Sequence, residues 1–243
     1  MRVLAVLAVW LPVCFSLTVS AQERPTVRAA RVEKGPVVDG SLDDAAWQAA
    51  PEIKGFTQHD PDDGKPSTEE TIVRIVYTEE AIYFGALLKD RSKVTTLLTR
   101  RDNSLSESDY LKVSIDAEHD RLTGAAFMVN PSNVQVDMIL HNDIAEDTSW
   151  DAVWESATRI VDGGWVAELR IPYSQLRYSD RSVHTWGINF TRRIQRNNEN
   201  ARLVNTPKGE SGAVSRFADL VGLEGIRARR RFELSPYAVA RSD

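Results

Sequence analysis

Residues 71–88 read TIVRIVYTEEAIYFGALL, and this stretch decides the fold class. β-branched and aromatic residues fill its two halves, residues 71–77 and 81–88, and a short polar break, Thr78-Glu79-Glu80, separates them. Such runs are typical of β-strands. Two of them around a three-residue polar break predict an antiparallel hairpin.

Six further runs of the same kind follow along the chain, at residues 110–116, 125–130, 134–140, 157–161, 165–171 and 186–192. Asp162-Gly163-Gly164 predicts a tight turn, because glycine supplies the positive φ that hairpin turns need. Helical signals are confined to short turns at residues 45–50 and 172–176. The sequence therefore predicts an all-β fold, a two-sheet antiparallel β-sandwich of jelly-roll or immunoglobulin-like type with one or two short helical turns.

The N-terminal residues 1–21 have the pattern of a secretory signal peptide. An early positive charge at Arg2 precedes an apolar run and the small-residue ending VSA, so we expect cleavage before Gln22. No later segment approaches the roughly 20 apolar residues of a membrane-spanning helix. We expect an exported protein, periplasmic, outer-membrane-associated or extracellular, with no transmembrane helix in the mature chain.

The chain has one cysteine, Cys14, which lies inside the predicted signal peptide. Lipidation at the sequence LPVC is the alternative, but Val13 is bulkier than the small residue expected before a lipidated cysteine. Loss of Cys14 with the signal excludes disulfides, zinc–thiolate sites and cysteine nucleophiles from the mature chain. A domain of about 200 residues is long enough to be stable on one hydrophobic core.

Charge is unevenly distributed along the chain. Residues 22–180 contain 17 basic and 29 acidic residues, a net charge of −12, whereas residues 181–243 contain 12 basic and 6 acidic residues, a net charge of +6. The acidic total argues against nucleic acid as a partner. The end of the chain, residues 227–243, reads as a basic linker followed by a fresh alternating run, which predicts the start of a missing C-terminal β-domain after a domain at residues 22–226.

Several short motifs occur in a fixed order along the predicted domain. They are VDGSLDDAAW at 38–47, RRD at 100–102, SDY at 108–110, FMVNP at 127–131, SWDAVWE at 149–155, AELRIPY at 167–173 and WGINF at 186–190. In this order they resemble the carbohydrate-binding module family 9 domains, over residues 27–223. The resemblance is strongest to the branch that precedes a β-rich domain of unknown function resembling an outer-membrane barrel.

The resemblance implies a β-sandwich that binds glycan and performs no chemistry, a possible accessory of glycoside hydrolases, with calcium bound in some members. Sugar recognition needs an aromatic face for the C–H face of a pyranose and fixed polar groups for its hydroxyls. The candidate sugar-binding residues are Trp150, Trp154, Asp151, Asp109, Arg101 and Asn130.

Each of these candidates also has a structural interpretation. Trp154 stands at the entry to a predicted strand, which favours a place in the core, and Arg101 with Asp109 is a natural ion pair for pinning a loop. Trp47 follows a glycine turn and is expected to close one end of the sandwich. Trp165 and Trp186 lie within alternating strands and are expected to pack inward.

Calcium is the metal that the acidic loops favour, because hard cations bind clustered oxygen atoms. Asp60 and Asp62 lie in one such loop, and Asp143 and Asp147 lie in another. Neither loop has the full EF-hand pattern, and a solvated acidic loop is the alternative interpretation.

Catalysis has little support, because the histidines lack metal-site spacing and no nucleophile elbow or phosphate-binding glycine loop occurs. Two other functions remain open from the sequence. One is a structural or docking domain that no longer binds sugar. The other is a haem-binding redox module, with His141 and either Met128 or Met138 as axial ligands.

Overall fold

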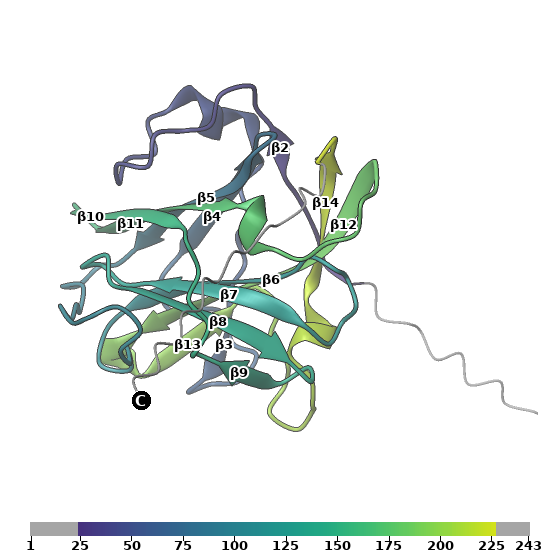
Figure 1. Ribbon diagram of the computed structural model, residues 1–243. Helices are drawn as coiled ribbons and strands as arrows, with labels where there is room; N and C mark the ends of the chain where they lie inside the picture. Colours follow the sequence, from purple (N-terminus) through teal and green to yellow (C-terminus); the bar gives the residue numbers. More distant parts are fainter. Residues whose placement is uncertain (1–23, 227–243) are drawn as a thin grey trace, which may run out of the picture.

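The computed structural model describes residues 24–226, which form a two-layer β-sandwich. Figure 1 shows the two sheets one above the other, with the smaller sheet at the top of the view. The large sheet has nine strands and the small sheet has five. The predicted signal peptide and the predicted C-terminal linker lie outside the described residues.

The small sheet has the strand order β10-β11-β5-β4-β2. Its strands are β2 (Ala30–Arg31), β4 (Thr71–Tyr77), β5 (Ala81–Lys89), β10 (Glu155–Val161) and β11 (Gly164–Pro172). The hairpin predicted from residues 71–88 is confirmed as β4 and β5. Gly163 and Gly164 both have positive φ in the turn between β10 and β11, as predicted.

The large sheet has the path β1-β14-β12-β6-β7-β8-β9, and β13 joins β12 to β3. Its strands are β1 (Thr26–Arg28), β3 (Thr57–Asp60), β6 (Tyr110–Asp116), β7 (Gly124–Val129), β8 (Gln135–His141), β9 (Ala145–Asp147), β12 (Val183–Ile194), β13 (Glu199–Arg202) and β14 (Ala218–Glu224). All strands that the sequence predicts are present, and β12 extends beyond its predicted bounds on both sides.

The sheets are not purely antiparallel. β1 runs parallel to β14, and β2 runs parallel to β4. The N-terminal segment therefore adds one short strand, β1, to the large sheet and the next, β2, to the small sheet. The prediction of an antiparallel sandwich holds for the remaining pairs, and the two sheets are mixed.

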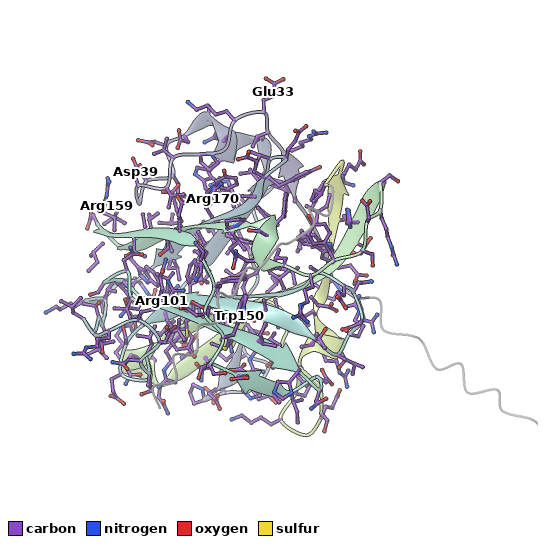
Figure 2. All side chains as sticks on the ribbon, in the orientation of Figure 1. Glu33, Asp39, Arg101, Trp150, Arg159 and Arg170 are labelled. Atoms are coloured by element: carbon purple, nitrogen blue, oxygen red, sulfur yellow. The ribbon has the colours of Figure 1, made fainter. Side chains whose placement is uncertain are left out.

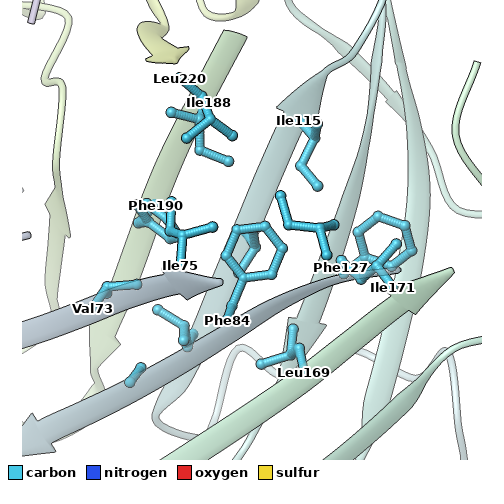
Figure 3. Close-up of a cluster of buried hydrophobic side chains, with 14 of the residues drawn as sticks. Val73, Ile75, Phe84, Ile115, Phe127, Leu169, Ile171, Ile188, Phe190 and Leu220 are labelled. Carbon is cyan, nitrogen blue, oxygen red and sulfur yellow. The ribbon is translucent and has the colours of Figure 1, made fainter. Parts of the chain in front are cut away.

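The core lies between the two sheets, where the inward-facing side chains of both layers meet. Figure 3 shows Phe84 and Ile75 of the small sheet facing Phe127 and Phe190 of the large sheet. All four are fully buried. Burial of such a side chain contributes about 1.5 to 3 kcal/mol relative to exposure, so these contacts dominate the stability of the sandwich. Trp165 and Trp186 are also fully buried, as predicted.

The outer face of the small sheet is covered in part by the segment that contains the short 3-10 turn η1 (Ala45–Ala49). Trp47 is 1% exposed, and its indole Nε1 donates a hydrogen bond to Glu168 on β11. Glu168 also accepts hydrogen bonds from the backbone N–H groups of Asp39 and Gly40. Trp47 thus closes this layer from outside rather than plugging the space between the sheets.

The remaining helical elements are three single 3-10 turns, η2 (Tyr173–Gln175), η3 (Gln195–Asn197) and η4 (Val214–Arg216). Within residues 24–226, none of the helices is long and apolar enough to cross a membrane.

Candidate functional site

The two tryptophans of the SWDAVWE motif lie on the strap from β9 to β10, residues 148–154, which crosses from the large sheet to the small one. Both indoles contact the ring of Phe127 edge-on, with ring centroids 5.9 Å away for Trp150 and 5.3 Å away for Trp154. Trp154 is 5% exposed and belongs to the core. Trp150 is partly buried, so its indole reaches the surface.

Arg101 fastens this strap. Its Nη2 donates hydrogen bonds to the buried carboxylate of Asp137 and to the carbonyl of Ala152, at 2.5 and 2.6 Å. Its Nη1 donates to Gln135 at 2.8 Å, and the exposed carboxylate of Asp151 lies 3.4 Å from Nη2. Figure 2 labels Arg101 and Trp150, which lie near the middle of the view. The structure thus brings Arg101, Trp150 and Asp151 together, with the guanidinium already engaged.

Asp109 and Asn130 are buried and bonded to the scaffold. The Asp109 carboxylate accepts hydrogen bonds from the backbone N–H groups of Thr95 and Gln195, and burial raises its pKa. The Asn130 side chain is fully buried and bonds the backbone of Leu97 and of Val134. Neither side chain offers a free group to a ligand at the surface.

The predicted ion pair between Arg101 and Asp109 is absent from the described part of the chain. Among residues 24–226, the carboxylates that pair with Arg101 belong to Asp102, Asp137 and Asp151. Asp109 instead holds its loop through the hydrogen bonds that its carboxylate accepts from the backbone amides of Thr95 and Gln195.

The four candidate calcium ligands are held by donors of the protein. Asp60 pairs with Lys208 at 2.9 Å, and Asp62 pairs with Lys65 at 3.1 Å. Asp143 accepts from the amides of the turn at residues 213–215, and Asp147 accepts from the amide of Ser149. Residues 24–226 contain no group of three or more His, Cys, Asp or Glu side chains arranged to hold a metal.

The proposed haem ligands do not share a face. His141 stands three positions after Met138 on β8. Side chains alternate between the two faces of a strand, so these two point to opposite faces. Met128 lies opposite Val136 and therefore on the same face as Met138. His141 and these methionines cannot both ligate one haem between them.

A polar groove runs over the outer face of the large sheet and reaches the strap at Thr148. Strand register places one row of outward side chains across the sheet, in the order Met128, Lys112, Thr191 and Arg202. Directly opposed residues in neighbouring strands have Cβ atoms about 5 Å apart, so Lys112 and Arg202 flank the smaller Thr191 at about 10 Å from each other. We call this surface the sheet groove.

Two adjoining hollows make up the sheet groove, one of about 150 Å³ and one of about 400 Å³. Both are lined by Tyr110, Lys112 and Glu146. The smaller hollow is also lined by residues 143–146 and by Thr206, Ala213, Val214 and Phe217. Because Lys112, Thr191 and Arg202 project from strands, their positions are fixed by the sheet rather than by loops.

The polar groups of the sheet groove form a partly connected set. Lys112 Nζ lies 2.8 Å from Glu146 Oε1, and the Tyr110 hydroxyl lies 3.5 Å from Asn200 Oδ1. Tyr110 is half-buried, and burial raises the pKa of its phenol. Arg202 is half-buried and lines the smaller hollow.

Another hollow, of about 810 Å³, lies beside the β4–β5 turn. The aromatic ring available there belongs to Tyr83, which is 7% exposed. The backbone of Gly35 lies so close that a Cβ on it would be 2.4 Å from the Tyr83 hydroxyl. Arg31 and Glu79 of its rim pair with each other at 3.1 Å. This hollow therefore offers a ligand little free aromatic or charged surface.

The sheet groove was not predicted from the sequence. Its signal was present in β6, where the outward positions Tyr110, Lys112 and Ser114 alternate with the buried positions Leu111, Val113 and Ile115. Polar residues on the outer face of an antiparallel sheet are usual, however. Only the pairing of β13 with β12 places Arg202 beside Thr191, and β13 was not predicted.

The structure is a β-sandwich with a polar groove on the outer face of one sheet. The family model described as carbohydrate family 9 binding domain-like matches residues 38–205. The chain belongs to this family, and it is a carbohydrate-binding module in class.

Solved structures with the same fold include family 9 carbohydrate-binding modules from Caldicellulosiruptor kristjanssonii. The complex with cellotriose matches at 15% identity and a TM-score of 0.58, covering 89% of this chain and 100% of the other. The complex with glucose matches at 14% identity and a TM-score of 0.59, covering 87% and 100%. A candidate carbohydrate-binding protein from Bacteroides uniformis ATCC 8492 matches at 13% identity and a TM-score of 0.66, covering 82% and 99%. No curated protein sequence matches the chain.

Proposed function

We propose that this chain is a non-catalytic module that binds glycan in the sheet groove. The observation that carries the proposal is the strand-borne row of Lys112, Thr191 and Arg202 beside the ring of Tyr110, within a walled hollow. The complexes of related modules with cellotriose and glucose support sugar as the ligand class.

The groups in the groove suit a pyranose. The ring of Tyr110 offers an apolar surface, while Lys112, Asn200 and Arg202 offer donors and Glu146 offers an acceptor for hydroxyl groups. Glycan binding in a preformed groove loses less side-chain entropy than binding on mobile loops.

Binding rather than hydrolysis is supported by the state of the acidic side chains in the smaller hollow. Glycosidases need a pair of carboxylates free to act on the glycosidic bond. Glu146 is paired with Lys112, and Asp143 accepts from two backbone amides and from the Ser215 hydroxyl. Both carboxylates therefore already have partners in the protein.

The proposal extends to an exported protein, placed on glycan to assist polysaccharide degradation by a larger polypeptide. It rests here on sequence alone, namely the signal-like pattern of residues 1–21 and the basic, strand-like residues 227–243. A C-terminal barrel-like domain or another envelope protein stays a predicted partner, also from the sequence alone. A docking domain is expected to expose an unpaired strand edge at residues 232–240, and these lie outside the described residues.

The test is isothermal titration calorimetry of the protein with glucose, cellotriose and a panel of other oligosaccharides. Tyr110→Ala removes the aromatic surface of the groove, and Thr191→Arg fills the space between Lys112 and Arg202. We expect both variants to weaken binding of any bound oligosaccharide by tenfold or more.

Trp150→Ala is the matched control, because it removes an aromatic surface at the strap. We expect this variant to keep the wild-type affinity. Loss of binding in Trp150→Ala with retention in Tyr110→Ala would move the site to the Arg101, Trp150 and Asp151 surface. No heat of binding with any saccharide would overturn the glycan-binding function itself.

A further inference from the structure

Arg202 is the one guanidinium that projects into the smaller hollow of the sheet groove. It lies on β13 opposite Thr191, and it is half-buried. Among residues 24–226, no side chain or carbonyl forms a hydrogen bond or ion pair with the guanidinium of Arg202. A buried or partly buried guanidinium is ordinarily paired, because removing its charge from water costs free energy that a partner offsets.

The carboxylates nearest to Arg202 are already engaged elsewhere. Asp60 lies 2.9 Å from Lys208 Nζ and accepts from Asn200 at 3.2 Å. Asp63 accepts from Asn205 and from the amide of Lys208. Glu146 pairs with Lys112. The charge of Arg202 is therefore left without a counterion of its own.

The pKa of Arg202 is consistent with this imbalance. Burial lowers the pKa of the guanidinium, and the attraction of Asp60, Glu146 and Asp63 does not fully offset that effect. Arginine is in effect always charged in proteins, so Arg202 remains a cation despite this shift. An anion bound beside it would be stabilised by a partly desolvated cation that presents a planar pair of donors.

We propose, resting on the glycan site above, that the sheet groove selects acidic sugars and that Arg202 pairs with the carboxylate of a uronic acid residue. Thr191 is small enough to leave space beside Arg202 for that carboxylate. Lys112, about 10 Å away across the row, is neutralised by Glu146 and takes hydroxyl groups instead. A uronate supplies both groups on one ring, a carboxylate at one end and hydroxyls along its edge.

A phosphate or a free acidic peptide would satisfy the charge alone. It would leave the hydroxyl-binding groups of the row without ligands. The combination of one unpaired cation with several neutral or neutralised donors and acceptors favours an acidic sugar over a simple anion.

The test compares each acidic oligosaccharide with its own methyl ester, which keeps the chain and the hydroxyls but removes the charge. Oligogalacturonate, oligoglucuronate and oligomannuronate are titrated by calorimetry into the full protein at low and high salt. Hydrogen bonds to a charged partner are stronger than neutral ones, so we expect at least one acid to bind about tenfold or more tightly than its ester. This preference should shrink at 0.5 M salt.

Arg202→Gln should abolish the preference for each acid over its ester, and the affinities of this variant for acid and ester should become equal within error. Arg202→Lys, which keeps the charge but not the planar fork, should retain part of the preference. Arg159→Gln, at an exposed guanidinium on the small sheet, should retain all of it. The melting temperature of each variant checks that the sandwich is intact.

The two proposals fail in different ways. If acid and ester bind equally, or if Arg202→Gln keeps the preference, the acidic-sugar assignment is overturned while the glycan-binding function stands. If no acidic, esterified or neutral oligosaccharide binds, both proposals are overturned.

Discussion

The indole Nε1 of Trp154 donates a hydrogen bond to Oδ1 of Asp137 across 3.0 Å, and both side chains are buried. Asp137 also accepts from Arg101 and from the amide of Ala152. This carboxylate therefore joins β8, the strap and the loop of Arg101 at one point. The second tryptophan of the SWDAVWE motif stabilises the fold, whatever its sequence context suggests about ligands.

Replacement of Trp154 should reduce stability without selectively affecting glycan binding. Trp154→Ala leaves a cavity beside Phe127 and removes one of the donors to Asp137, so we expect its free energy of unfolding to fall by about 3 to 5 kcal/mol. Trp154→Phe should lose about 1 to 3 kcal/mol, mainly from the hydrogen bond. Urea denaturation followed by tryptophan fluorescence measures both. A Trp154→Phe variant as stable as wild type would show that the bond to Asp137 contributes nothing net.

Glu168 makes stability depend on pH in a defined direction. Burial raises its pKa above the ordinary 4.5, although three N–H donors oppose the shift. The folded protein therefore holds a proton that the unfolded chain releases, in the range just above pH 4.5. The contribution of Glu168 to stability is greatest below this range and falls as pH rises through it.

Glu168→Gln removes this titration, so the stability difference between wild type and variant should shrink as pH rises from 4.5 toward 7. Urea unfolding at several pH values measures the difference. Glu155→Gln, at an exposed carboxylate on β10, is the surface control. A difference that grew with pH would contradict a raised pKa for Glu168.

Gly164 holds the turn that attaches β10 to β11. A Cβ there would lie 2.1 Å from the carbonyl oxygen of Leu88, and φ is +149°. We expect Gly164→Ala to cost about 2 kcal/mol or more. Gly163 also has positive φ, at +73°, but a Cβ there would meet nothing within 4 Å.

Gly163→Ala is thus the matched control and should cost about 1 kcal/mol from backbone strain alone. Thermal or urea unfolding of the two variants distinguishes the loss of stability caused by the close approach of Leu88 from the loss caused by backbone strain. Equal losses in the two variants would show that the close approach is relieved by a small shift of the strands.

Calcium should have little effect on the described domain. A ligand that binds the folded state raises stability by an amount set by its concentration relative to its dissociation constant. Because Asp60, Asp62, Asp143 and Asp147 already accept from protein donors, we expect the melting temperature to change by less than about 2 °C between EDTA and millimolar calcium. A larger increase of the melting temperature in calcium would support metal binding at the acidic loops.

The sequence predicted the long strands well, because each carries an unbroken run of β-branched or aromatic residues. β3, β9 and β13 are only three or four residues long and mostly polar, so periodicity could not reveal them. β1 and β2 join their sheets in parallel to strands far along the chain. Such pairings depend on the assembled sandwich rather than on local pattern.

The candidate site was harder to predict than the fold. Tryptophan and charged residues in one motif indicated the strap, and the structure brings Arg101, Trp150 and Asp151 together there. Arg202 had no comparable signal, because an isolated arginine in a polar stretch is ordinarily solvated. Its importance comes from what surrounds it, namely Thr191 beside it and neighbouring carboxylates that are paired with other donors.

The most direct test of the account is nuclear magnetic resonance mapping of backbone amides during titration with an oligosaccharide that binds. We predict that the largest shifts fall on β6, β12 and β13, at Lys112, Thr191 and Arg202, with small shifts at Trp150 and Arg101. Largest shifts at Trp150 and Arg101, with β12 and β13 unchanged, would contradict the sheet groove as the binding surface.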